Sequence, residues 1–185
     1  MTATSTAPAG PVPHAPLLRL DHRLLRSTRR ALGGTPAVPV ARGLSYFGEH
    51  ALGWLAVGAV GWLRGRRRDE WATGLAGVVG AHAAGVVVKR LVRRVRPDLA
   101  DVPALVATPS RLSFPSAHSC STAAAAVGYG PMIGRAPMAA VTAVMLVSRV
   151  LLGVHYPSDV LSGAALGAGV AAALRRRAVT TRRKA

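Results

Sequence analysis

The chain has 185 residues, half of them hydrophobic, and it carries 24 Lys plus Arg against 7 Asp plus Glu, a formal net charge of +17. In a soluble protein this charge would indicate a nucleic-acid partner, but here the basic residues form clusters between long uncharged stretches of Ala, Val, Gly and Leu. That alternation is typical of a polytopic membrane protein and disfavours a soluble helical bundle with basic loops. We therefore expect a single-domain, all-α membrane bundle that contacts the lipid bilayer and binds no nucleic acid.

The first 43 residues have a different composition from the rest of the chain. Residues 1–16 are rich in Thr, Ala and Pro and lack an apolar core of signal-peptide length, so we expect a disordered tail. Residues 17–43 are basic, and the stretch RLDHRLLRSTRRAL within them predicts an amphipathic helix that lies at the membrane surface.

Five apolar stretches follow and define a membrane-embedded domain at residues 44–174. They are residues 44–63, 71–88, 119–133, 136–154 and 160–174. The first, second and fourth approach the about 20 residues that cross a bilayer. The third and fifth are shorter and rich in alanine, a pattern that also fits a buried helix, although their small residues would allow close packing in lipid. We predict about five transmembrane helices.

Charge also predicts an orientation. The five spans alternate consistently if residues 64–68, Arg135 and the basic tail at 175–185 face the cytoplasm. Under this topology the loops with polar, chemically versatile residues face outward from the plasma membrane. The basic run at residues 89–96 and the segment at 17–43 depart from the pattern.

The first of three polar clusters is KRLVRRVRP at residues 89–97. Lys89 and Arg96 are seven residues apart, about two helical turns, so on one helix they would project from nearly the same face with Arg93 between them. Such a set could bind one anion. A run of this kind can equally be a solvated face or one that binds lipid head groups.

The second cluster is FPSAHS at residues 114–119, directly before an alanine-rich stretch. Ser116 lies where a helix would begin, so the backbone N–H groups of Ala117 and His118 would point toward an anion. His118 is then placed to donate a proton. The alternative is that Ser116 is an ordinary helix N-cap beside an incidental histidine.

The third cluster is SRVLLGVHYPSD at residues 148–159. Arg149 near the end of an apolar run is costly in a membrane unless it binds something. His155 precedes Tyr156-Pro157 and should lie on a loop, because proline disfavours helix in the residues before it and suits the first turn of the next helix. Asp159 could then hold one ring nitrogen of His155 and leave the other as a nucleophile, or it could only cap the last helix.

In combination the three clusters resemble the type 2 phosphatidic acid phosphatase superfamily. Its signature is Lys, six residues, Arg-Pro; then Pro-Ser-Gly-His; then Ser-Arg, five residues, His, three residues, Asp. The matching positions are Lys89, Arg96-Pro97, Pro115-Ser116-Ala117-His118, Ser148-Arg149, His155 and Asp159. Ala117 replaces the usual glycine, a change that a helix start tolerates.

The resemblance implies a lipid phosphatase that needs no metal and no cofactor. His155 would attack phosphorus to form a phosphohistidine, Asp159 would orient it, and His118 would protonate the leaving group. The phosphoryl oxygens would be bound by Lys89, Arg96, Ser116, Ala117 and Arg149. If instead the chain were a non-catalytic membrane protein that binds anionic lipid, loss of His155 would leave its function intact.

The substrate depends on weaker features. Arg93, Glu49 and His50 could contact a head group, although a helix–helix hydrogen bond is the commoner reason for such polar residues. Within the superfamily, the small size and the segment GLSYFGEH at residues 43–50 resemble actinobacterial enzymes that act on decaprenylphosphoryl-5-phosphoribose, a precursor of cell-wall arabinan. Other candidates are undecaprenyl pyrophosphate, phosphatidic acid and phosphatidylglycerol phosphate.

Overall fold

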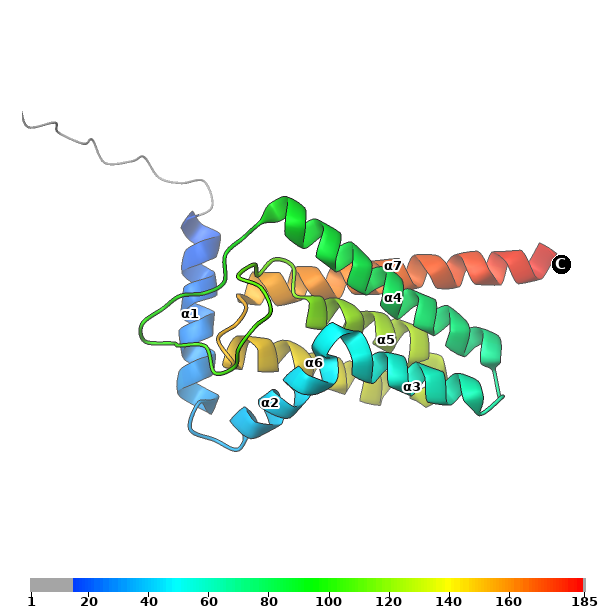
Figure 1. Ribbon diagram of the computed structural model, residues 1–185, viewed down its shortest axis with the longest axis horizontal. Helices are drawn as coiled ribbons and strands as arrows, with labels where there is room; N and C mark the ends of the chain where they lie inside the picture. The colour runs from blue at the N-terminus through cyan, green and yellow to red at the C-terminus, as the bar shows by residue number, and fades with distance from the viewer. Residues whose placement is uncertain (1–14, 185) are drawn as a thin grey trace, which may run out of the picture.

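The computed structural model describes residues 15–184, and within them the chain is helical with no β-strand (Figure 1). The elements are α1 (Ala15–Leu32), α2 (Ala37–Gly48), the 3₁₀ turn η1 (Glu49–Ala51), α3 (Leu52–Leu63), α4 (Arg68–Val92), α5 (Ala117–Ile133), α6 (Arg135–Leu151) and α7 (Pro157–Lys184). The predicted all-α class is confirmed. The predicted disordered tail at 1–16 lies outside the described residues apart from Ala15 and Pro16, which begin α1.

Helix α5 lies at the centre of the bundle, in contact with α4, α6 and α7, while α3 covers α4. Small residues make these contacts close. A Cβ atom added to Gly163 of α7 would lie 2.6 Å from the carbonyl oxygen of Ser116, and one added to Gly128 of α5 would lie 2.9 Å from the Cα atom of Gly74. The alanine and glycine content of these stretches therefore allows the helix backbones to approach one another.

Two helices among the described residues are long and apolar enough to cross a membrane, Arg68–Val92 and Pro157–Thr181. They contain the predicted spans at 71–88 and 160–174. Helices α5 and α6, each of 17 residues, are about 25 Å long. The number of about five transmembrane helices thus stays a prediction. Two of the predicted spans coincide with helices that are long enough to cross a membrane.

The predicted first span at residues 44–63 is not a single helix. Helix α2 ends at Gly48, and His50 and Ala51 adopt left-handed backbone conformations with φ of 49° and 62°. Helix α3 then runs for 12 residues, about 18 Å. The chain bends where Gly48 packs against the ring of His118, a tertiary contact that hydropathy does not report.

The bundle has two chemically different ends (Figure 1). At one end, the basic end, lie residues 64–68, the start of α6 and the last part of α7. Contacts there include Arg67 Nη1 to the carbonyl oxygen of Pro131 at 2.8 Å and Arg175 Nη1 to that of Val127 at 2.6 Å. At the opposite end, the site end, the loops at 93–116 and 152–156 meet. All the predicted phosphate-site residues come to this end or next to it.

Helix α1 lies across the site end rather than along the bundle (Figure 1). Arg29 donates from Nε to the carbonyl oxygen of Leu151 at 3.0 Å and from Nη2 to that of Pro103 at 2.8 Å. Arg26 pairs with Asp101 at 2.6 Å. The basic residues of this segment, which depart from the charge pattern of the membrane spans, thus include two that bind the helix to the loops of the site end.

Candidate active site

A cavity of about 590 Å³ opens at the site end, and residues from five helices and two loops line it. The predicted site residues in its wall are Glu49, His50, Lys89, Arg93, Arg96, Ala117, His118, Arg149 and His155. Two other predicted residues, Ser116 and Asp159, are fully buried behind this wall. Residues from 49 to 159 are therefore brought together in one place, as the three sequence clusters predicted.

His155 lies on the loop between α6 and α7, as predicted, and its side chain is almost fully buried. Its Nε2 atom is 3.1 Å from Nη1 of Arg96. A guanidinium group can only donate, so Nε2 accepts this bond and the hydrogen of the neutral ring is on Nδ1. Burial, and after it the positive charge of Arg96, holds the pKa of His155 well below its usual value. The ring is therefore neutral at pH 7, and the lone pair of Nε2 is directed at Arg96, another residue of the cavity wall.

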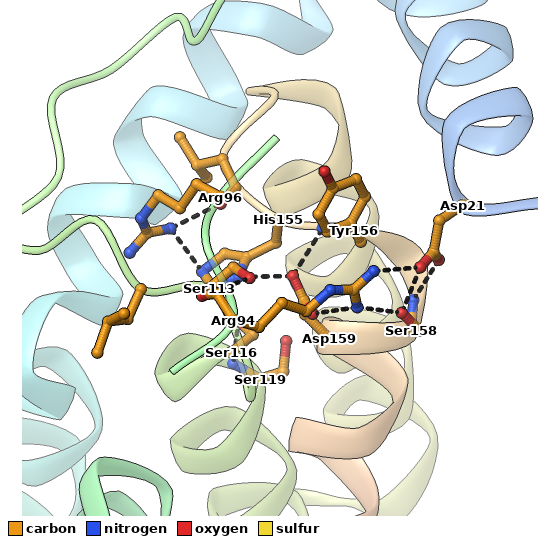
Figure 2. Close-up of polar contacts among 12 residues, drawn as sticks. Asp21, Arg94, Arg96, Ser113, Ser116, Ser119, His155, Tyr156, Ser158 and Asp159 are labelled. Atoms are coloured by element: carbon orange, nitrogen blue, oxygen red, sulfur yellow. Dashed lines mark hydrogen bonds and ion pairs between the residues drawn. The ribbon is translucent and has the colours of Figure 1, made fainter. Parts of the chain in front are cut away.

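Asp159 lies in the first turn of α7, as predicted, and its carboxylate faces the other ring nitrogen of His155 (Figure 2). The distance from Oδ2 to Nδ1 is 3.6 Å, which is an electrostatic contact too long for a hydrogen bond. Oδ2 accepts instead from the backbone N–H of Tyr156 at 2.9 Å, and Oδ1 accepts from Arg94 at 2.8 Å. Asp159 thus caps α7, as the second alternative predicted, and its carboxylate lies near His155 without a hydrogen bond to Nδ1. That it orients the ring of His155 stays a prediction.

Arg149 is the clearest sign of an anion site. It is only 2% exposed, and its Nε and Nη1 atoms have no hydrogen-bond partner among the described residues. An unpaired buried guanidinium group is costly, whereas an anion bound in the cavity would satisfy it.

Lys89 and Arg96 meet at the cavity by a different route from the predicted one. Helix α4 ends at Val92, and Arg93 has a left-handed conformation with φ of 54°, so Arg96 lies on the following loop and not two turns along the same helix. Lys89 Nζ donates to the carbonyl oxygens of Leu112 and Ser113, each at 3.1 Å, which binds that loop back onto α4.

Arg96 is held by backbone oxygens of both loops. Nε donates to the carbonyl oxygen of Ser110 at 2.9 Å and Nη1 donates to that of Val154 at 2.6 Å. Burial lowers the pKa of Arg96 to about 10, which still leaves it charged at neutral pH. The loop thus presents a fixed cation next to Nε2 of His155.

The start of α5 carries the second cluster. Ser116 is the N-cap, and its Oγ accepts from the backbone N–H of Ser119 at 3.4 Å. This is the alternative in which Ser116 is an ordinary helix N-cap. Ala117, where the family has glycine, is the first helical residue, a conformation that alanine adopts without strain. His118 lines the cavity with Nε2 3.0 Å from the carbonyl oxygen of Ser45. A phosphate contact by Ser116 stays a prediction.

Sequence reasoning missed three contributors to the site: Arg94, Asp21 and Ser45. Arg94 lies in the same basic run as Arg93 and Arg96, and no local pattern separates it from them. Asp21 and Ser45 act through residues more than 70 positions away, Arg94 and His118. Among the described residues, no group of three or more His, Cys, Asp or Glu side chains could hold a metal ion.

The family model of the PAP2 superfamily matches residues 71–183, which include the three clusters and the wall of the cavity apart from its residues between 45 and 50. The chain belongs to the PAP2 superfamily. As a PAP2 protein it is a phosphatase, and the curated relatives agree. A decaprenylphosphoryl-5-phosphoribose phosphatase of Mycobacterium tuberculosis (strain CDC 1551 / Oshkosh) is 53% identical over 133 residues, which cover 71% of this chain and 75% of that protein. One of Mycolicibacterium smegmatis is 47% identical over 147 residues, 78% of this chain and 82% of that protein.

Solved structures of PAP2 type share the fold. The transmembrane PAP2 type phosphatidylglycerolphosphate phosphatase of Bacillus subtilis superposes with a TM-score of 0.74 at 22% identity, covering 89% of this chain and 87% of that one. LpxE of Aquifex aeolicus gives a TM-score of 0.68 at 18% identity, covering 85% of this chain and 95% of that one. These likenesses show the fold of the chain, and two of its described helices are long and apolar enough to cross a membrane.

Proposed function

We propose that this PAP2 phosphatase hydrolyses the 5-phosphate of decaprenylphosphoryl-5-phosphoribose through a phosphohistidine intermediate on His155. One observation carries the proposal: unpaired Arg149 lies with Lys89 and Arg96 around a cavity that His155 also lines. Three cations next to a neutral nitrogen nucleophile form a site for a phosphate monoester.

In the first step Nε2 of His155 attacks phosphorus. The N–P bond forms, the bond from phosphorus to the ribose 5-oxygen breaks, and His118 gives a proton to the departing alkoxide. The hydrogen on Nδ1 stays in place, so the ring of His155 becomes positive and Asp159, 3.6 Å away, stabilises it. The dianionic phosphate favours the protonated form of His118 before this step.

In the second step a water molecule attacks the phosphohistidine. His118, now neutral, takes a proton from the water as the O–P bond forms, the N–P bond breaks and inorganic phosphate leaves. Lys89, Arg96 and Arg149 stabilise the charge on the phosphoryl oxygens in both steps, and the N–H groups at the start of α5 add to it.

The substrate has a second phosphate, in the link between ribose and the polyprenyl chain, and the cavity wall continues toward a place for it. A second cavity of about 530 Å³ shares Ser45, Glu49 and residues 107–109 with the first, and Arg42 lies in its wall. We propose that Glu49 and His50 contact the ribose and that Arg42 binds the linking phosphate. The names of the relatives at 47–53% identity support this substrate.

We propose further that the enzyme spans the plasma membrane about five times with the site end outward. The positive-inside rule supports this orientation, because the basic end gathers residues 64–68, Arg135 and the end of α7. Helix α1 would then lie at the outer interface, and the exposed leucines at 17, 20 and 24 would face lipid.

The proposal is tested by phosphate release from purified protein in detergent. We would compare the wild type with His155→Ala on decaprenylphosphoryl-5-phosphoribose, undecaprenyl pyrophosphate, phosphatidic acid and phosphatidylglycerol phosphate. The expected result is fastest turnover of the phosphoribose lipid and none above background by the variant. Faster turnover of another lipid would overturn the substrate, and an active variant would overturn the nucleophile.

A further inference from the structure

Asp21 is a buried carboxylate of α1 that belongs to none of the three sequence clusters. It is 2% exposed, and it binds the start of α7, where Asp159 lies. Its Oδ1 accepts from the backbone N–H of Ser158 at 2.9 Å and its Oδ2 accepts from the hydroxyl of Ser158 at 2.6 Å. A helix at the edge of the bundle thus reaches the residue next to the catalytic carboxylate (Figure 2).

Arg94 joins the two carboxylates. Nη2 donates to Oδ2 of Asp21 at 2.8 Å, and Nη1 donates to Oδ1 of Asp159, also at 2.8 Å. The guanidinium group lies over the ring of Tyr156, 4.1 Å from its centroid, which fixes its plane. One cation therefore serves two carboxylates in a buried cluster.

The charges of this cluster matter because the ring of His155 becomes positive when Nε2 bonds to phosphorus. If Arg94 faced Asp159 alone, the pair would be neutral and would stabilise that positive ring little. With Asp21 the cluster of two carboxylates and one guanidinium keeps one net negative charge. The charged groups that lower the pKa of His155 are all basic: Lys89 on α4, Arg96 on the loop, His118 on α5 and Arg149 on α6.

We infer that Asp21 is a positioning residue of the reaction: it neutralises Arg94, so that the charge of Asp159 remains available to His155 in the transition state. This inference rests on the proposed phosphohistidine chemistry but not on which lipid is the substrate. It assigns a role to α1, which lies outside the PAP2 match because that match begins at residue 71.

Vanadate and inorganic phosphate separate this role from simple anion binding. Vanadate can form a five-coordinate adduct with a histidine nitrogen and so resembles the transition state, whereas phosphate only occupies the anion site. We would measure both affinities by calorimetry on the purified full-length protein in detergent. For Asp21→Asn the expected result is vanadate binding weaker by about tenfold, with phosphate binding within about twofold of wild type.

Two further variants distinguish charge from folding. Asp101→Asn removes a carboxylate that pairs with Arg26 of α1 and lies outside the cluster, so it should leave both affinities unchanged. The double variant Asp21→Asn with Arg94→Gln restores one net negative charge on Asp159. It should bind vanadate more tightly than Asp21→Asn alone, although it makes fewer contacts.

Each outcome decides a different statement. If Asp21→Asn binds vanadate as Asp101→Asn does, or if the double variant binds no better than Asp21→Asn, the inference is overturned while the nucleophile stands. If His155→Ala binds vanadate as tightly as wild type, the phosphohistidine mechanism has failed and the inference fails with it. Turnover of the phosphoribose lipid, measured alongside, should fall in kcat for Asp21→Asn with KM nearly constant.

Discussion

The two sides of the His155 ring are built in opposite ways. On the Nε2 side, Arg149 has buried donors without partners among the described residues, and the cavity leaves space for a ligand. On the Nδ1 side, Arg94 donates to both Asp21 and Asp159, and none of these three residues lies in the wall of the cavity. The open side keeps unsatisfied charge for a substrate, and the closed side satisfies its charge in advance. A residue on the open side should therefore matter for activity at a cost to stability, and one on the closed side should matter for both.

The largest test of this contrast is Arg149→Met. Removing a cation that contacts the transition state should lower kcat by about 10²–10³-fold. Because the guanidinium group is buried and unpaired, the same change should raise the unfolding temperature in detergent. Turnover and thermal unfolding, measured on the same preparation, give the change in kcat and the change in unfolding temperature.

Asp159→Asn provides the matched comparison from the closed side. It should lower activity and stability together, because Arg94 and the N–H of Tyr156 each lose a charged partner. The contrast between the open and the closed side is contradicted if Arg149→Met and Asp159→Asn shift the unfolding temperature in the same direction.

A smaller effect is expected for Gly48→Ala, on the open side. A Cβ atom there would lie 2.5 Å from Cδ2 of His118, so the ring must move away from the position it holds beside Ser45. We expect kcat to fall about tenfold or more, since misplaced acid–base groups lose most of their contribution. Gly43→Ala, with nothing within 4 Å of the added atom, is the control in the same helix and should behave as wild type.

The lowered pKa of His155, which lies between the two sides, predicts that the stability of the protein depends on pH. Its pKa is lowered in the folded state, so the unfolded chain binds a proton at higher pH than the folded one. Stability should be complete above about pH 6.5 and decrease below it by up to about 1.4 kcal/mol per pH unit. Unfolding of wild type and His155→Gln, measured from about pH 5 to about pH 8, would test this, and the stability of the variant should depend less on pH.

The smallest effect is expected for Arg42→Gln, at the far end of the cavity system. It should raise KM for decaprenylphosphoryl-5-phosphoribose by about threefold to tenfold, as for one exposed phosphate contact, and leave kcat nearly unchanged. Phosphatidic acid, which has no second phosphate, should show no change. An equal rise of KM for both lipids would place Arg42 outside the proposed subsite.

The contrast also explains what could be predicted from the sequence. The open side is lined by residues of three local motifs, among them Lys89, Arg96, Arg149 and His155, and their roles in the reaction stay predictions. Local proline rules placed His155 on a loop and Asp159 in the first turn of α7. The closed side depends on contacts between residues 65 to 137 positions apart, so no periodicity reports it.

The error in the first span has a similar cause. Residues 44–63 are apolar enough for one helix, yet the backbone reverses its conformation at His50 and Ala51. At this bend Gly48 packs against His118, which comes from another part of the chain. Hydropathy measures how well a segment suits lipid, and it does not measure the shape that neighbouring helices require.

The crossing of α1 over the site end bears on where this enzyme can be shortened. A fragment cut at the family boundary, residue 71, would retain every signature residue. It would lack Arg26 and Arg29, which bind the residues of the site end. It would also lack Asp21 and the part of the cavity wall between Ser45 and His50. The segment that matches the family and the part of the chain that builds the site thus have different limits. A tag or fusion is therefore better placed after α7, at the basic end, than in front of α1.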